Sequence, residues 1–197
     1  MPTTITLAEP LELDDGIYSM HAPVAFYGEE WDLTHLNAFS FHTDPGLGFE
    51  VEVVVIFSCH CFTHGFKRDL RPRPAIPTHE IHVTSTESRV LDPVRYELSK
   101  KVLRRIILEL PQRKIIVAGG PTGNFVTWEL VRKDGASQLY AIFLETEKAK
   151  KRKRRVMLRI QSAYILDEDL TPRQKKAKKV TWDTLIKSAY LGRKIRE

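Results

Sequence analysis

The chain has 197 residues, of which 42% are hydrophobic, and its formal net charge is +6. This length suits one domain with extensions, and the hydrophobic share is large enough to form a core. No stretch approaches the roughly 20 apolar residues of a membrane span, and no charged-then-apolar leader opens the chain, so we expect no membrane partner and no secretory signal. Cys59 and Cys61 are too close in sequence to pair well with each other, which favours a reducing, cytoplasmic compartment.

Charge is distributed unevenly along the chain. Residues 1–50 contain nine acidic residues and no Lys or Arg, whereas the remaining 147 residues hold all 31 basic residues and 16 acidic ones. An asymmetry of this size suggests a polyanion, RNA or DNA, as partner of the basic part. The acidic N-terminal region could instead lie against that basic surface or dock a protein partner, and the plainest alternative is that both ends are simply solvated.

The first half of the chain predicts strands and turns. Short apolar runs at Thr3–Leu13 and Val24–Tyr27 are typical of strands, while the spacing from Trp31 to Phe39 favours a short helix. Glu50–Phe62 predicts a strong strand with two mostly apolar faces, which indicates a central position in a sheet. The proline-rich segment 68–77 predicts a loop, and His79–Ser85 predicts a short strand.

The best predicted helix begins at Asp92 and Pro93, a good N-cap followed by a residue that fits the first turn. Apolar residues recur at a spacing of four up to Leu110, and Pro111 stops the pattern. Strands are then expected at Lys114–Ala118 and Asn124–Val131. The glycine-rich segment between them lacks the ending of a phosphate-binding loop, so we interpret it as a turn. Lys133, Asp134 and Gly135 predict a hairpin turn.

Gln138–Ile165 predicts one long β-hairpin with a basic tip. Apolar residues fill 139–144, and residues 156–165 alternate with a period of two. Seven of the eight residues from Lys148 to Arg155 are basic, and such a self-repelling run is expected to be exposed. A second basic cluster follows before a short C-terminal helix. The residues expected to bind nucleic acid are Lys148, Lys150, Lys151, Arg152, Lys153, Arg154, Arg155, Lys175, Lys176, Lys178 and Lys179.

These elements predict an α+β fold in which one main helix packs on an antiparallel β-meander, with N-terminal strands and a short C-terminal helix. The expected segments are an acidic N-terminal extension at 1–49, an α+β core at 50–170, and a basic linker with the terminal helix at 171–197.

The segment Ser58–His64 holds the residues best suited to chemistry. Cys59, His60, Cys61 and His64 are possible zinc ligands, but on a strand His60 would face away from both cysteines and no second cysteine pair exists. Core packing or a nucleophilic thiol are the alternatives. We therefore expect no metal and no cofactor, and we keep His60 as a candidate general base.

Arg159 and Tyr164 are further catalytic candidates on the second strand of the hairpin. Arg159 lies between apolar positions, so it is expected either to pair with an acid or to face a bound anion. In a regular strand Tyr164 would lie on the opposite face from Arg159.

Three short motifs carry a resemblance to a known group of proteins. The segments 57–63 (FSCHCFT), 95–99 (RYELS) and 161–164 (QSAY) resemble bacterial plasmid and integrative-element proteins named heat shock protein C or stationary-phase growth adaptation protein. The resemblance spans roughly residues 50–165 and implies a mobile-element protein linked to stress. It carries no chemistry and no catalytic residues.

The predicted architecture is similar to that of RelE and barnase-like ribonuclease toxins. That similarity implies metal-independent RNA cleavage, in which His60 or Tyr164 moves the proton and Arg159 stabilises the phosphorane charge. No motif of those toxins matches this chain. The sequence therefore predicts a nucleic-acid-binding protein of a bacterial mobile element, which could be an endoribonuclease; the alternative is a non-catalytic protein-interaction module with a basic docking hairpin.

Overall fold

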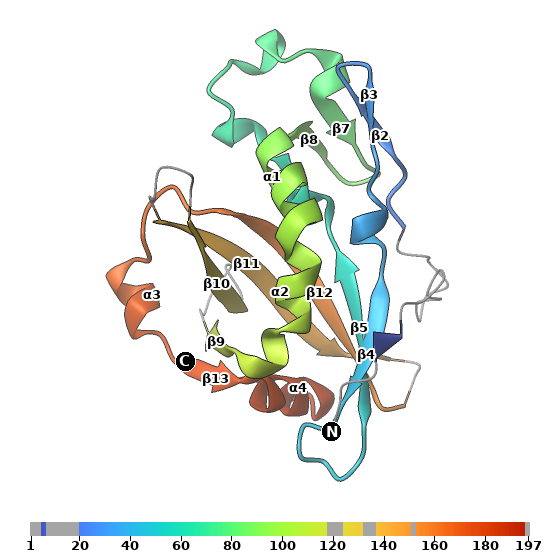
Figure 1. Ribbon diagram of the computed structural model, residues 1–197, viewed down its shortest axis with the longest axis vertical. Coiled ribbons are helices and arrows are strands. Elements are labelled where there is room, and N and C mark those ends of the chain that lie inside the picture. The colour runs from blue at the N-terminus through green and yellow to red at the C-terminus, as the bar shows by residue number, and fades with distance from the viewer. Residues whose placement is uncertain (1–4, 7–19, 118–123, 132–136, 151–152, 196–197) are drawn as a thin grey trace.

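The fold is built around one eight-stranded sheet that carries a long helix across one face (Figure 1). The computed structural model describes residues 5–6, 20–117, 124–131, 137–150 and 153–195. Neighbouring strands of the sheet are antiparallel except for β5 and β12, which are parallel. Their order is β1–β4–β5–β12–β11–β10–β9–β13, with bounds β1 Ile5–Thr6, β4 Phe39–Thr43, β5 Val51–Phe57, β9 Lys114–Val117, β10 Asn124–Val131, β11 Ser137–Lys148, β12 Arg155–Ile165 and β13 Lys179–Thr181.

The predicted α+β class is confirmed, with β9 to β12 as the antiparallel meander. Strands from each of the three expected segments join this one sheet, because β4 pairs with β5 and β13 pairs with β9. No helix among the described residues is long and apolar enough to cross a membrane.

The main helix starts where the sequence predicts and runs from Pro93 to Leu108 in three parts. These are α1 (Pro93–Leu98), a π-helical turn (Ser99–Leu103) and α2 (Arg104–Leu108). The Asp92 side chain caps its start by accepting the backbone N–H groups of Val94 and Arg95. Because the π turn shifts the register, the residues buried on the sheet are Tyr96, Leu103, Ile106 and Ile107 rather than a strict four-residue stripe.

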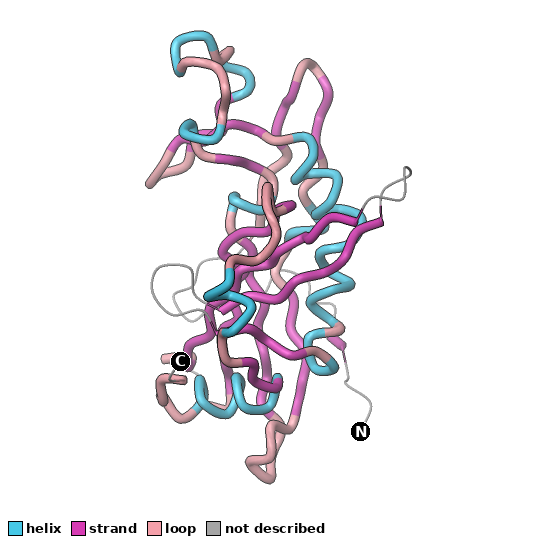
Figure 2. Tube along the Cα trace, turned by 90° about the vertical axis from the view of Figure 1, so that its left-hand side faces the viewer, coloured by secondary structure: helices cyan, strands magenta, loops and turns pink. Residues whose placement is uncertain are grey.

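The main core lies between this helix and the sheet. Ile142 and Leu144 of β11 and Leu158 and Ile160 of β12 face it, and α4 (Trp182–Tyr190) closes its lower end with the fully buried Trp182. The opposite face of the sheet carries two small apolar clusters, one around Val54 and Met157 and one around Ala141 and Phe143. A tube view turned by 90° shows the main helix running along one side of the strands (Figure 2).

Two small sheets extend the molecule beyond the first turn of α1 (Figure 1). One pairs β2 (Val24–Phe26) with β3 (Glu29–Trp31), and the other has the order β6–β8–β7, with β6 Thr63–His64, β7 Ile81–Val83 and β8 Ser88–Leu91. The β2–β3 turn places Tyr27 and Gly28 in the left-handed region, with φ of 51° and 82°. The strained Tyr27 is held by a hydrogen bond from its hydroxyl to Glu80.

Two predicted elements differ from the structure. The strand expected over Glu50–Phe62 is central but ends at Phe57, where Ser58 caps a 3-10 turn at Cys59–Cys61. The helix expected from Trp31 to Phe39 is only a 3-10 turn at Thr34–Leu36, and Phe39 starts β4. In both cases the apolar pattern in the sequence continues past the end of the regular element. Buried turns carry apolar residues just as buried strands do, so the pattern did not mark where the element ends. The glycine-rich segment 119–123 and the turn at 133–135 lie outside the described residues.

Candidate functional site

The described residues at the tip of the β11–β12 hairpin include four exposed cations, and two of these lie on aromatic rings from other parts of the chain. The Nζ of Lys148 is 4.8 Å from the ring centroid of Tyr190 in α4, and the guanidinium carbon of Arg154 is 4.7 Å from that of Phe49. The two rings meet edge to face with centroids 5.5 Å apart. The α4 residue Lys187 donates to the carbonyl of Gly46 nearby. We term this surface the basic end; its members are Lys148, Lys150, Lys153, Arg154, Lys187, Phe49 and Tyr190.

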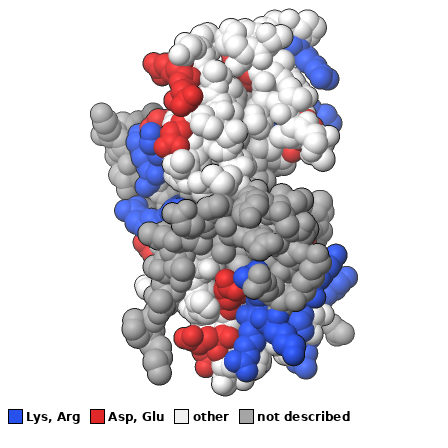
Figure 3. Space-filling view, turned by 90° about the vertical axis from the view of Figure 1, so that its right-hand side faces the viewer, with Lys and Arg blue, Asp and Glu red and all other residues white. Residues whose placement is uncertain are grey.

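The hairpin cations of the basic end have no acidic partner among the described residues. Within the part of the chain that the structure describes, no carboxylate lies within ion-pair distance of Lys148, Lys150, Lys153 or Arg154. A space-filling view shows Lys and Arg gathered at the lower end of one face, with some acidic side chains beside them (Figure 3). Positive charge is therefore concentrated at this end, and the neighbouring acidic side chains offset part of it.

The tip is less exposed than the sequence predicted. Arg155 is buried, and its Nε lies 2.8 Å from Oε2 of Glu52 on β5. Ala149 is buried too, and its N–H donates to the Arg155 carbonyl to close the turn. Arg155 is thus a structural ion-pair partner and does not belong to the basic end. Lys151 and Arg152 lie outside the described residues.

The second basic cluster lies elsewhere on the molecule. It occupies α3 (Pro172–Lys176) and the start of β13, which Figure 1 places on the opposite side of the sheet from the hairpin tip. Lys175 is paired with Asp169 at 2.6 Å, and the Lys178 carbonyl accepts the N–H of Val117. Lys175, Lys176, Lys178 and Lys179 therefore do not form one continuous surface with the hairpin cations. The N-terminal acids Glu9, Glu12, Asp14 and Asp15, expected to cover basic groups, lie outside the described residues.

His60 lies far from the basic end, in the 3-10 turn that follows β5. Its Nε2 is 2.7 Å from Oε1 of Glu87, and the Cys59 thiol is 3.7 Å from the same oxygen. Cys61 points into the main core instead and is fully buried. The prediction that the two cysteines share one face and His60 the other is wrong, because the chain leaves the strand geometry at Ser58.

Arg159 and Tyr164 lie on β12, and a β-bulge changes their relation. Leu144 pairs with Ile160 but Phe143 pairs with Ser162, so Gln161 is an extra residue. As a result Tyr164 lies on the same face as Arg159, not on the opposite face as a regular strand would require. Arg159 Nη2 is 4.0 Å from Oε1 of Glu147, and the Arg159 side chain is about half exposed. Of the two expected outcomes, Arg159 therefore forms the ion pair with an acid on the neighbouring strand and does not face a buried anion site.

Tyr164 lines a pocket of about 340 Å³ at the N-terminal end of α1. The guanidinium carbons of Arg68 and Arg95 lie 4.5 and 4.6 Å from its ring centroid. Each cation is also paired with an acid, Arg68 with Asp167 and Arg95 with Asp92. Of the three catalytic candidates, Tyr164 is among the described residues that line this pocket, whereas His60 and Arg159 are not. The three candidates therefore do not converge on it.

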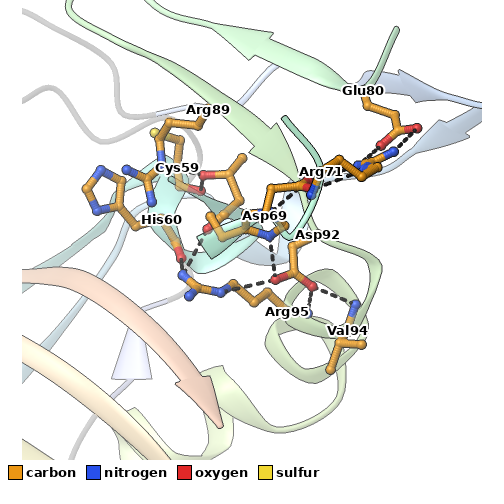
Figure 4. A network of polar contacts seen from close by, with 11 residues as sticks. Cys59, His60, Asp69, Arg71, Glu80, Arg89, Asp92, Val94 and Arg95 are labelled. Carbon is orange, nitrogen blue, oxygen red and sulfur yellow. Dashed lines mark hydrogen bonds and ion pairs between the residues drawn. The ribbon is translucent and has the colours of Figure 1, made fainter. Parts of the chain in front are cut away.

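A network of polar contacts extends from this pocket to the small sheets (Figure 4). Asp92 accepts a hydrogen bond from His64 and pairs with Arg95, whose Nη1 donates to the carbonyls of His60 and Thr63. Figure 4 shows the His60 ring pointing away from Asp92 and Arg95. Burial lowers the pKa of Arg95, and the charge of Asp92 opposes that shift. The sequence marked Asp92 as a helix cap and His60 and His64 as possible ligands, but it did not predict their contacts with Arg95 and Asp92, because these partners are distant in the chain.

Arg71 joins the proline-rich loop to the turn before β7, on the far side of the network. It donates to Asp69 and to Glu80, and these hydrogen bonds hold the pKa of both carboxyl groups below their usual range. The arrangement fixes the proline-rich loop, which suggests a structural role.

Comparison with known proteins places the chain in a family. A protein-family model with the description YjaZ family matches residues 23–190. The chain belongs to the YjaZ family. It is 29% identical to Protein YjaZ of Escherichia coli (strain K12) over 146 residues, which is 72% of this chain and 76% of that relative. No solved structure matches it.

The family assignment corrects the resemblances inferred from the short motifs. The match covers segments 57–63, 95–99 and 161–164 and assigns them to the YjaZ family, so the resemblances to heat shock protein C or stationary-phase growth adaptation proteins and to RelE or barnase-like toxins are wrong. Three such short motifs were a weak basis for a family assignment, because short matches also occur between unrelated proteins. The matched span includes both the basic hairpin and the Cys59–His60 turn.

Proposed function

We propose that the basic end binds nucleic acid through contacts with the phosphate backbone. One observation carries this proposal: Lys148, Lys150, Lys153 and Arg154 gather at one tip without a carboxylate partner among the described residues. Cations of this kind bind phosphates by releasing condensed counterions, whatever the base sequence.

The aromatic rings beneath the tip support the same function. A free lysine or arginine side chain loses up to about 2 kcal/mol of rotamer entropy when it is fixed in a complex. Contact with Tyr190 and Phe49 restricts Lys148 and Arg154 before binding, so less of that entropy remains to be lost. The exposed guanidinium plane of Arg154 can also stack on an unpaired base, which favours single-stranded nucleic acid.

Binding is better supported than cleavage. His60, Arg159 and Tyr164 lie in three separate surroundings, and the arginines next to Tyr164 are already paired with acids. A metal-independent ribonuclease needs its proton-transfer groups and its anion stabiliser around one phosphate. We also propose a cytoplasmic location, where nucleic acid is available and where the free thiols Cys59 and Cys61 remain reduced.

Salt dependence of binding tests the proposal. Fluorescence anisotropy would measure the affinity for a labelled single-stranded RNA and the matching DNA over a series of salt concentrations. The plot of the log of the binding constant against log salt concentration has a negative slope. The triple variant Lys150→Gln, Lys153→Gln, Arg154→Gln should reduce the magnitude of that slope by about 2, because each phosphate contact on a single strand contributes about 0.7.

A matched control removes the same charge from the opposite side of the molecule. The triple variant Arg173→Gln, Lys176→Gln, Lys179→Gln should leave the slope nearly unchanged. Equal losses in both variants, or a wild-type affinity that does not depend on salt, would refute a specific basic end. Binding to a poly-glutamate peptide with the affinity of the RNA would favour the protein-docking alternative instead.

A further inference from the structure

Two turns bring three different metal-ligating atoms together at the end of β5, away from the basic end. Cys59 and His60 come from the 3-10 turn, and Glu87 comes from the turn that joins β7 to β8. The Cys59 Sγ, a ring nitrogen of His60 and a carboxylate oxygen of Glu87 all lie within 4.8 Å of one another. We propose that Cys59, His60 and Glu87 form a binding site for a zinc ion.

The spacing of the donor atoms suits zinc. Tetrahedral zinc with bonds of about 2.0 Å to nitrogen or oxygen and about 2.3 Å to sulfur keeps its ligand atoms roughly 3.3–3.7 Å apart. The Cys59 thiol is already 3.7 Å from Oε1 of Glu87. His60 Nε2 is 2.7 Å from that oxygen, so an ion entering between them needs only a small outward rotation of side chains that are partly exposed.

The chemistry of the donor set selects zinc among common ions. A thiolate, an imidazole and a carboxylate are the three ligand types that zinc accepts, whereas magnesium and calcium require oxygen donors. The thiolate and the carboxylate together balance the charge of the ion.

Outer contacts hold two of the three ligands in place. Arg89 Nη1 donates to Oε2 of Glu87 at 3.1 Å and so leaves Oε1 directed at Cys59 and His60. Arg89 Nε also donates to the Thr63 hydroxyl, and that hydroxyl donates to the Cys59 carbonyl. Figure 4 shows Arg89 beside Cys59 and His60. Fixing ligands through such contacts is typical of built metal sites.

A nucleophilic thiol explains the cluster less well. A Cys–His pair works when the imidazole accepts the thiol proton, but here both Cys59 and His60 direct their polar atoms at the same Glu87 oxygen. Burial and the charge of Glu87 also raise the pKa of the Cys59 thiol to about 11, which opposes a reactive thiolate in the absence of an ion.

The site is open on one side. The side chains of His60 and Glu87 are 34% and 36% exposed, so a fourth position can be filled by water or by a small ligand. Three protein ligands with one open position are the pattern of exchangeable or catalytic zinc rather than of closed structural zinc.

Cobalt substitution tests the site directly, because tetrahedral Co²⁺ with a thiolate ligand gives a charge-transfer absorption band. The full chain, freed of metal, should bind one Co²⁺ with this band, and Zn²⁺ should displace it. Cys59→Ser should abolish the band, while Glu87→Gln should weaken Zn²⁺ binding at least 10-fold in a competition with a chelating dye. Circular dichroism would confirm that each variant is folded.

Two control variants identify the ligands. Cys61→Ser removes the other thiol, and His79→Gln removes an exposed histidine; both should retain the band and the affinity for Zn²⁺. A wild-type protein without the charge-transfer band, a band that survives in Cys59→Ser, or Zn²⁺ binding unchanged by Glu87→Gln would overturn the proposal. If Cys61→Ser fails to fold, the comparison of His79→Gln with His60→Gln decides it, since only His60→Gln should lose affinity.

Discussion

Asp92 connects the helix cap to the buried arginine, so its replacement is expected to be costly. In Asp92→Ala the N–H groups of Val94 and Arg95 lose their acceptor, which costs about 1 kcal/mol. The Arg95 side chain, 7% exposed, also loses the carboxylate 3.3 Å away. Breaking a buried pair costs about 3–5 kcal/mol. We use about 2 kcal/mol because Arg95 keeps its bonds to two carbonyls.

The expected total for Asp92→Ala is about 3 kcal/mol, which corresponds to a decrease in Tm of about 6–12 °C for a chain of this size. Asp92→Asn separates the two contributions, because asparagine caps helices as well as aspartate does but carries no charge. It should lose only about 2 kcal/mol. Urea unfolding followed by circular dichroism would measure both variants. If Asp92→Asn is as stable as the wild type, the ion pair with Arg95 contributes nothing and the reasoning fails.

Three further predictions concern stability. Arg155→Ala removes the ion-pair partner of Glu52 and should lower the free energy of unfolding, measured with urea, by about 2 kcal/mol. Adding Glu52→Gln to this variant should recover part of the loss. Burial lowers the pKa of His35 from 6.5, so the unfolded chain binds more protons below that value. Stability should therefore fall as pH decreases through 6.5, and in His35→Asn the decrease in Tm below that pH should be smaller than in the wild type; an unchanged profile would contradict this. Trp182 is 1% exposed, and Trp182→Ala should cost about 3–5 kcal/mol, more than Trp182→Phe; equal losses would show that the ring does not fill the core as described.

The hairpin cations of the basic end could be predicted from the sequence. The density of Lys and Arg between residues 148 and 155 marked an exposed hairpin tip, because such a run cannot be buried as a whole. The rings of Phe49 and Tyr190 could not be predicted, since they come from a loop and a helix about 100 residues before and 40 residues after the tip. The sequence marked Cys59 and His60 as possible zinc ligands but not the zinc site itself, because a two-residue alternation predicted a strand that turns the two side chains apart, and Glu87 carried no signal of its own.

Local patterns in the sequence determined the capped helix at Asp92, the long hairpin and the α+β class, because capping, periodicity and turn chemistry act over a few residues. The tertiary structure alone decided that β5 lies beside β12, which buries Arg155 against Glu52, and that the bulge at Gln161 brings Tyr164 to the face of Arg159. It also decided that Glu87 meets Cys59 and His60. These contacts depend on which distant segments become neighbours, and that choice is made by burial of the whole core rather than by any one stretch of chain.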